Sequence, residues 1–227
     1  VHRIGITIKN PKMADLRRIP LHLNKLLYQL WAPMVAWNMN RKYHYDAMWG
    51  MMAHATSVPL FITYLFTRVP YVLTLQEGDS IQHIMKKMKP VMFFFKRGFT
   101  NAKIIQPIST FLGRWAIDMG FEGEVVLVPN AVNTAHFMQE YSDIEMTEAK
   151  KEIGKHNGEV YIVTTSRLVK KNGIADVVSA LAFLPQNIKF LIFGIGPDEN
   201  VLKYSQGPLF LKGLEIHLLR LWRQDCQ

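Results

Sequence analysis

The stretch VYIVTTSRLVKKNGI, residues 160–174, decides the fold of this chain. It opens with the apolar run Val160–Thr165, which predicts a strand, and it ends where the helical spacing of Ile174–Leu184 begins. A second apolar run, Ile188–Phe193, follows after a short connection. Strands that alternate with helices along a chain build parallel sheets. The stretch therefore predicts a strand–helix–strand unit of an α/β fold.

The same alternation extends away from this unit. We expect further strands at Asp46–Trp49, Tyr71–Leu75, Lys103–Ile108 and Val125–Val128. We expect helices at Leu21–Met39 with a kink at Pro33, at Pro59–Phe66, from a cap at Ser109 to Met119, and from Asp198 onward. The pattern thus predicts α/β layering along most of the chain.

One break in the alternation marks a domain boundary. Pro129-Asn130 opens a polar, charge-rich stretch that continues to Gly158. We therefore predict two domains, residues 1–130 and residues 131–227. The chain opens with Val1 rather than Met, and the second series stops after two strands. We accordingly expect both domains to be incomplete.

Composition excludes several classes of protein. With 227 residues, of which 49% are hydrophobic and 20% charged, the chain is globular rather than disordered. The longest uncharged apolar stretch, Ala55–Thr67, is too short to span a bilayer, and the N-terminus has no signal-peptide pattern. The single cysteine, Cys226, excludes an internal disulfide and a cysteine-based metal site. We expect no metal and a cytoplasmic location.

Positive charge is concentrated in the first half. Residues 1–120 carry 16 Lys and Arg against 5 Asp and Glu, whereas residues 121–227 carry 11 against 13. Such a field could face nucleic acid, an anionic membrane or an anionic substrate, or it could be a solvated surface. Because no RNA-binding aromatic motif, zinc spacing or recognition helix is visible, we expect no nucleic-acid partner.

Two strand-to-helix turns in the second half suit a phosphate ligand. In the first, Ser166–Gly173, a strand end, Arg167, lysines and a helix start come together, as a diphosphate requires. The alternative is a basic loop without a ligand. In the second, Gly194 and Gly196 would let the backbone approach a ligand, and Pro197 suits a first helical position. Such turns are also common in α/β proteins that bind nothing there.

Two further turns carry polar residues. Val128–Asn133, with Pro129 and Asn130, predicts a rigid turn at the domain boundary. Gln76–Asp79 places two carboxylates at the carboxyl end of a predicted parallel strand, where α/β proteins bind ligands. The alternative for this segment is capping of a helix by Asp79 or Ser80.

In combination, these segments resemble a known family. The runs IIQPIS (104–109), EVVLVPNAVN (124–133), TTSRLVKKNGI (164–174) and IFGIGPDENVL (192–202) are similar to motifs of retaining glycosyltransferases of family 4, the "group 1" transferases. The resemblance covers the chain from about Tyr45 to Leu202. It implies a GT-B fold, in which two Rossmann-like domains hold an acceptor and a nucleotide sugar.

The resemblance also implies roles for residues. The catalytic residues would be Arg167 and Lys171, whose positive charges neutralise the donor diphosphate. The lysine of the family motif itself falls on Asn172. The donor-binding set would be Ser166, Asn172, Gly173, Gly194, Gly196, Pro197 and Asn130. The acceptor side would be Glu77, Gly78 and Asp79, where many relatives carry a histidine–glycine–acid loop. The nearby His54 receives no role, because a lone histidine is more often structural.

The resemblance implies an enzyme that transfers a sugar from a nucleotide sugar to a glycan or lipid-linked acceptor with retention of configuration, without a cofactor. Relatives also carry an acidic pair beyond the nucleotide turn and a glycine-rich N-terminal loop, and neither is visible here. The alternative is therefore a noncatalytic, truncated or degenerate module that binds without turnover.

A membrane contact is a further expectation. Lys86, Lys87, Lys89, Lys96 and Arg97 flank the apolar run Val91–Phe95. This mixture suits peripheral contact with anionic lipid at the inner face of a membrane. Alternatively, Met92–Phe95 is one face of a buried helix and the cations are solvated.

Overall fold

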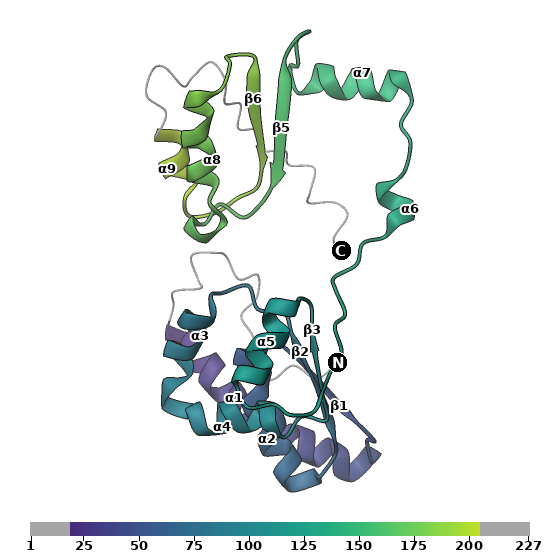
Figure 1. The fold of residues 1–227 in the computed structure, drawn as a ribbon, viewed down its shortest axis with the longest axis vertical. Coiled ribbons are helices and arrows are strands. Elements are labelled where there is room, and N and C mark those ends of the chain that lie inside the picture. The colour runs from purple at the N-terminus through teal and green to yellow at the C-terminus, as the bar shows by residue number, and fades with distance from the viewer. Residues whose placement is uncertain (1–18, 205–227) are drawn as a thin grey trace. The chain divides into compact units, whose positions relative to one another are not determined.

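A computed structural model describes residues 19–204 of the chain (Figure 1). The chain divides after Asn133 into two compact units, which are described separately. Each unit alternates strands with helices and pairs its strands in parallel, so the predicted α/β class is confirmed. Between residues 19 and 204, no helix is both long and apolar enough to cross a membrane.

The first unit is a parallel four-stranded sheet with its helices. The order of elements is α1 (Ile19–Tyr43), β1 (Met48–Met51), α2 (Ala53–Thr67), β2 (Tyr71–Leu75), α3 (Ile81–Met88), a 3₁₀ turn (Lys89–Val91), α4 (Met92–Thr100), β3 (Ile104–Pro107), α5 (Thr110–Asp118) and β4 (Glu124–Val125). The strands lie in the order β1-β2-β3-β4. Because all pairings are parallel, the carboxyl ends of the strands share one edge of the sheet.

The core of the first unit lies between the sheet and its helices. Alternate residues of β2, Tyr71, Leu73 and Leu75, are at most 1% exposed, as the period of a strand requires. They belong to one cluster with Phe95 and Phe99 of α4. At Gly98 the two helices α2 and α4 approach so closely that a Cβ atom would clash with the backbone of Ser57. Glycine thus permits the helix packing that closes this core.

The second unit is built on the opening stretch. Its elements are α6 (Thr134–Phe137), α7 (Asp143–Glu152), β5 (Val160–Thr165), a 3₁₀ turn (Lys170–Asn172), α8 (Ile174–Ala180), a second 3₁₀ turn (Leu181–Phe183), β6 (Ile188–Phe193) and α9 (Glu199–Tyr204). The strands β5 and β6 pair in parallel from Val160↔Ile188 to Thr165↔Phe193. Leu168, Ile174, Val178, Phe190, Ile192 and Leu202 form its core.

Several boundaries differ from the sequence prediction. Helix α1 continues through Pro33 to Tyr43, and α2 begins at Ala53, with Pro59 inside it. The last strand of the first sheet is only Glu124–Val125. Residues beyond it still bond to β3, since Val126 N donates to Ile105 O. Hydrogen bonding and packing with neighbouring elements therefore decide where these helices and strands begin and end more than the local sequence preference does.

The polar stretch between the two series is partly helical, which the sequence prediction missed. Helix α7 begins at Ser142, whose hydroxyl accepts from Glu145 N, while the Glu145 carboxylate accepts from Ser142 N. This capping box was readable from the spacing of the two residues. The periodic pattern of apolar residues did not indicate a helix here, because α7 buries no residue and so has no apolar stripe.

Candidate functional site

The carboxyl ends of β5 and β6 continue as two paired loops. Ser166 N donates to Phe193 O and Leu168 N donates to Ile195 O, both at 3.0 Å. Asp198 N also donates to Leu168 O at 3.1 Å, which is a third backbone hydrogen bond between the two loops. The side chain of Leu168 is buried in the core. The two turns predicted to face a phosphate therefore lie side by side and are held rigidly by backbone hydrogen bonds.

Both glycines of the second turn are required by this pairing. A Cβ atom on Gly194 would overlap the carbonyl oxygen of Ser166, and one on Gly196 would overlap that of Leu168. Backbone atoms cannot move aside as a flexible side chain can. The sequence suggested that these glycines let the backbone approach a ligand. The structure supplies a different and sufficient reason, which is the approach of one loop to the other.

The basic loop has a defined internal structure. Asn172 Nδ2 donates to Ser166 Oγ and to Arg167 O, both at 2.8 Å. Gly173, at φ +67°, ends the 3₁₀ turn, and Ile174 opens α8. The side chains of Arg167 and Lys171 are exposed. Asn172 thus braces the loop, while the two cations extend from it.

The predicted donor set is brought together only in part. Ser166, Arg167, Lys171, Asn172, Gly173, Gly194, Gly196 and Pro197 all lie on the two loops at the carboxyl edge of the β5–β6 pair. Asn130, by contrast, is exposed in the segment between β4 and α6, and it belongs to the other unit.

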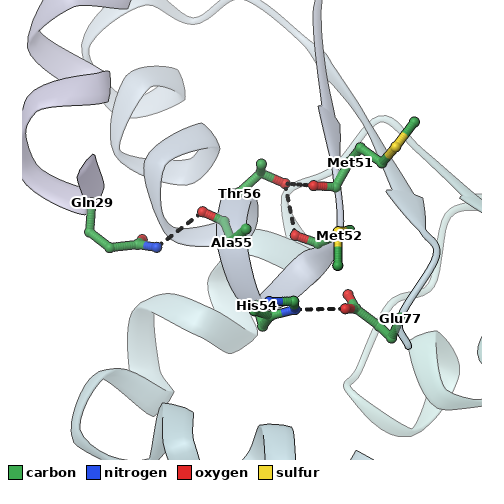
Figure 2. A network of polar contacts seen from close by, with 7 residues as sticks. All are labelled: Gln29, Met51, Met52, His54, Ala55, Thr56 and Glu77. Atoms are coloured by element: carbon green, nitrogen blue, oxygen red, sulfur yellow. Dashed lines mark hydrogen bonds and ion pairs between the residues drawn. The ribbon is translucent and has the colours of Figure 1, made fainter. Parts of the chain in front are cut away.

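The first unit holds a histidine–carboxylate pair that the sequence did not predict. His54 Nδ1 lies 2.7 Å from Glu77 Oε2 (Figure 2). His54 stands in the first turn of α2, just after β1, and Glu77 follows β2. Because β1 and β2 are neighbours in a parallel sheet, their carboxyl ends bring the two residues together. The shared position just after adjacent strands was the signal in the sequence that could have assigned His54 a partner.

The turn before His54 is tightly held. Met52 has φ +68°, a backbone conformation rare for residues other than glycine. Thr56 Oγ1 donates to the carbonyl oxygens of Met51 and Met52, both at 3.2 Å. Gln29 Nε2 of α1 donates to Ala55 O at 3.0 Å (Figure 2). These bonds tie the end of β1 to the start of α2, so His54 is placed by a rigid turn.

The carboxylate of Glu77 is deeply buried and half satisfied. Its side chain is 1% exposed, whereas that of His54 is 18% exposed. Oε2 bonds to His54, but Oε1 has no hydrogen-bond partner within the described part of the chain. A buried acceptor left without a donor costs about 1–3 kcal/mol. Glu77 therefore has the capacity to accept one more hydrogen bond.

A pocket of about 400 Å³ lies in this unit, with Glu77 among its lining residues. It is lined by Glu77, Asp79, Ser80, Ile81, Gln82, Ile108, Ser109, Phe111 and Leu112. The helices α3 and α5 begin there, each with a capping serine: Ser80 Oγ accepts from His83 N and Ser109 Oγ from Leu112 N, both at 3.3 Å. Of the two caps considered for the Gln76–Asp79 segment, Ser80 is the one that caps α3. Gly78 and Asp79 are exposed.

No metal site is assembled by the described residues, since no three histidine, cysteine, aspartate or glutamate side chains gather between residues 19 and 204. Cys226 lies outside that range.

Comparison with known proteins gives both a sequence relative and structural neighbours. No family model matches the sequence. Over 136 residues the chain is 27% identical to the putative teichuronic acid biosynthesis glycosyltransferase TuaC of Bacillus subtilis (strain 168), which covers 60% of this chain and 34% of that protein. The chain thus spans about a third of the curated relative.

Among solved structures, Anabaena Alr3699/HepE in complex with UDP and glucose matches with a TM-score of 0.64 at 17% identity, over 82% of this chain and 51% of that one. A glycosyltransferase from Rickettsia africae ESF-5 matches with a TM-score of 0.61 at 14% identity, over 83% and 50%. These likenesses show the fold, and the chain spans about half of each neighbour. In sequence and in fold, this chain is therefore similar to glycosyltransferases of the GT-B type.

Proposed function

We propose that this protein transfers a sugar from a nucleotide sugar to a glycan or lipid-linked acceptor, with retention of configuration. One observation carries the proposal: the cations Arg167 and Lys171 extend from a braced loop at the carboxyl edge of the β5–β6 pair. Ligands of open α/β sheets bind outside this edge. Structural neighbours of the chain were solved with UDP and with UDP-glucose. Residues 131–227 would accordingly hold the donor, and residues 1–130 the acceptor.

The chemistry required of the donor site is charge stabilisation. When a sugar leaves a nucleoside diphosphate, negative charge builds on the diphosphate oxygens. Preorganised cations that meet this charge lower the barrier to transfer. Arg167 and Lys171 would supply that positive charge. Asn172 stands where the family has a lysine, and its amide is already bonded to Ser166 Oγ and Arg167 O, so it would hold the loop rather than contribute charge.

The remaining donor residues would shape the site. Ser166 and Gly173 bound the basic loop, and Gly194, Gly196 and Pro197 form the facing turn. Asn130 is also part of the proposed donor set.

On the acceptor side, the proposal rests on Glu77. Glu77 is among the residues that line the pocket, and its Oε1 atom is buried and has no partner among the described residues. A sugar hydroxyl is a donor of the kind this oxygen lacks. His54 would fix the orientation of the carboxylate through the 2.7 Å contact to Oε2. Gly78 and Asp79, next in the chain, would border the bound acceptor.

The cellular setting is part of the same proposal. A cytoplasmic protein at the inner face of a membrane would meet both a nucleotide sugar and a lipid-linked acceptor. No nucleic-acid partner and no metal are invoked.

Titration calorimetry of the chain with UDP, GDP and ADP tests the donor site. We expect one nucleotide to bind, and we expect Arg167→Ala to weaken that binding by about 10-fold to 100-fold, the range of one charge-assisted contact. Lys171→Ala should also weaken it. Lys150→Ala, which removes an exposed lysine of α7, is the matched control and should bind as the parent chain does.

Either of two results would refute the donor site: no binding of any of the three nucleotides, or equal binding by the parent chain and the Arg167→Ala variant. Binding without transfer to any glycan or lipid-linked acceptor would instead identify a noncatalytic module.

A further inference from the structure

The outer side of α4 carries aromatic side chains that the core does not use. Phe95, Gly98 and Phe99 form the buried side of the helix. At 100° per residue, Phe93 lies on the opposite side, and it is 64% exposed. Its neighbours Phe94 and Val91 are exposed as well. We call Val91, Phe93 and Phe94 the aromatic face.

The aromatic face contacts α2 through one ring pair. The rings of Phe93 and Phe94 meet edge to face with centroids 5.5 Å apart. The Phe94 ring lies 6.4 Å from that of Phe61 in α2. Leu65 follows Phe61 by one helical turn on the same side of α2 and is exposed. The aromatic face therefore packs at one edge on the buried Phe61 of α2, and its exposed part lies on Val91, Phe93 and Phe94.

The segment of the chain that carries this surface is rich in cations and has no carboxylate. Between Ser80 and Ile117 the chain has no aspartate or glutamate. It has seven cations there: Lys86, Lys87, Lys89, Lys96, Arg97, Lys103 and Arg114. Arg97, one turn after Phe93, places its guanidinium carbon 5.5 Å from the centroid of that ring. Lys89 and Lys96, which precede and follow the aromatic face in the chain, are exposed.

We propose that the aromatic face docks on an anionic lipid surface, with Phe93 and Phe94 entering the boundary between headgroups and acyl chains. Helices that lie in this boundary combine phenylalanine with lysine and arginine, as α4 does. Lys89, Lys96 and Arg97 would then meet lipid phosphates. A protein partner is a poorer fit, because the core of a protein interface is depleted of lysine. The inference rests on this surface alone and stands apart from the nucleotide chemistry of the second unit.

Co-sedimentation with lipid vesicles tests the inference on the whole chain. The probes are vesicles of phosphatidylcholine alone and vesicles with about one-third phosphatidylglycerol, which carry the negative surface charge. We expect binding to the anionic vesicles only, weakening as salt is added. Phe93→Ser with Phe94→Ser should reduce binding about 10-fold or more, the value of one buried phenylalanine. Lys96→Gln with Arg97→Gln should reduce it about 5-fold for each cation removed.

The matched control is Phe183→Ser, because Phe183 is 88% exposed in the second unit and lies outside the aromatic face. Its binding should equal that of the parent chain, and far-UV circular dichroism should be the same for all variants. The inference is wrong if the parent chain does not sediment with anionic vesicles. It is also wrong if the Phe93→Ser, Phe94→Ser variant binds as well as the control. Binding of a single-stranded oligonucleotide that is lost in the same variants, without vesicle binding, would assign the face to nucleic acid instead.

Discussion

Replacing His54 with alanine should expose how the carboxylate of Glu77 is held. The Glu77 side chain is 1% exposed, and its one hydrogen bond within the described residues is the 2.7 Å contact to His54 Nδ1. In His54→Ala both carboxylate oxygens would lack a partner. Leaving a buried acceptor without its hydrogen-bond partner costs about 1–3 kcal/mol, and more for a charged group. Because His54 is 18% exposed, water would reach the gap, and we expect a loss of about 2–3 kcal/mol.

Urea unfolding followed by far-UV circular dichroism at neutral pH measures this loss. The control is His83→Ala, which removes an exposed histidine of α3 whose hydrogen bond to Ser80 is made by the backbone and survives the change. That variant should stay within about 0.5 kcal/mol of the parent chain. The variant with both His54→Ala and Glu77→Ala no longer buries an unpaired charge. It should be less unstable than the two single losses added together, by about 1–3 kcal/mol of coupling.

If His54→Ala costs no more than His83→Ala, the pair does not hold the carboxylate, and the acceptor site proposed around Glu77 loses its physical basis. A large loss without coupling in the double variant would show that His54 stabilises α2 in some other way. Only a large loss together with coupling supports the reasoning from the structure.

Four further predictions concern the frame of the two units. Gly194→Ala should destabilise the second unit by about 2–3 kcal/mol, because its Cβ would overlap the Ser166 carbonyl; urea unfolding measures the change. Ser142→Ala should remove the capping box of α7 and cost about 1 kcal/mol. Hydrogen bonds from the backbone and the hydroxyl of Ser142 lower the pKa of Glu145. The stabilisation from the ionised Glu145 side chain is therefore present at neutral pH, and it should be lost as the pH falls from the ordinary pKa of a glutamate through the lowered one. Hydrogen exchange of α7 measured across this pH range checks the prediction. Arg68→Gly should raise the free energy of unfolding by about 0.5–1 kcal/mol, measured by thermal unfolding. Arg68 ends α2 with φ +58°, a left-handed conformation that strains an arginine and that glycine adopts without strain.

Most of the sheet framework could be predicted from the sequence. The strands Val160–Thr165, Ile188–Phe193 and Tyr71–Leu75 have the predicted bounds, because each is a largely apolar run that lies between polar turns in the sequence. Helix ends were harder to predict. The start of α2 lies six residues before Pro59, in a turn whose left-handed Met52 leaves no mark in the sequence pattern.

The candidate site, like the fold, could be predicted from the sequence only in part. Both loops of the second unit were predicted as strand-to-helix turns, and their pairing could be expected because they follow strands of one parallel unit. The contact between His54 and Glu77 was not, since it depends on the register of β1 and β2 and on the direction of two side chains. Neither the register nor the direction is set by local sequence. The unpartnered oxygen of Glu77 was equally hidden, because only packing decides which atoms are left without a donor.

The residues that carry the family resemblance are not all of one kind. Gly194 and Gly196 are fully explained by the clash that any side chain would make with the neighbouring loop. Asn172 is explained by the two bonds through which it braces that loop. Matches at such positions are evidence of a shared fold, because any protein with these paired loops would need them. The exposed Arg167 and the unpartnered Oε1 atom of Glu77 are not explained by such a contact. A function is therefore better sought at these two residues than in the conspicuous glycine motif, and Arg167→Ala separates chemistry from architecture more cleanly than any substitution of Gly194 or Gly196.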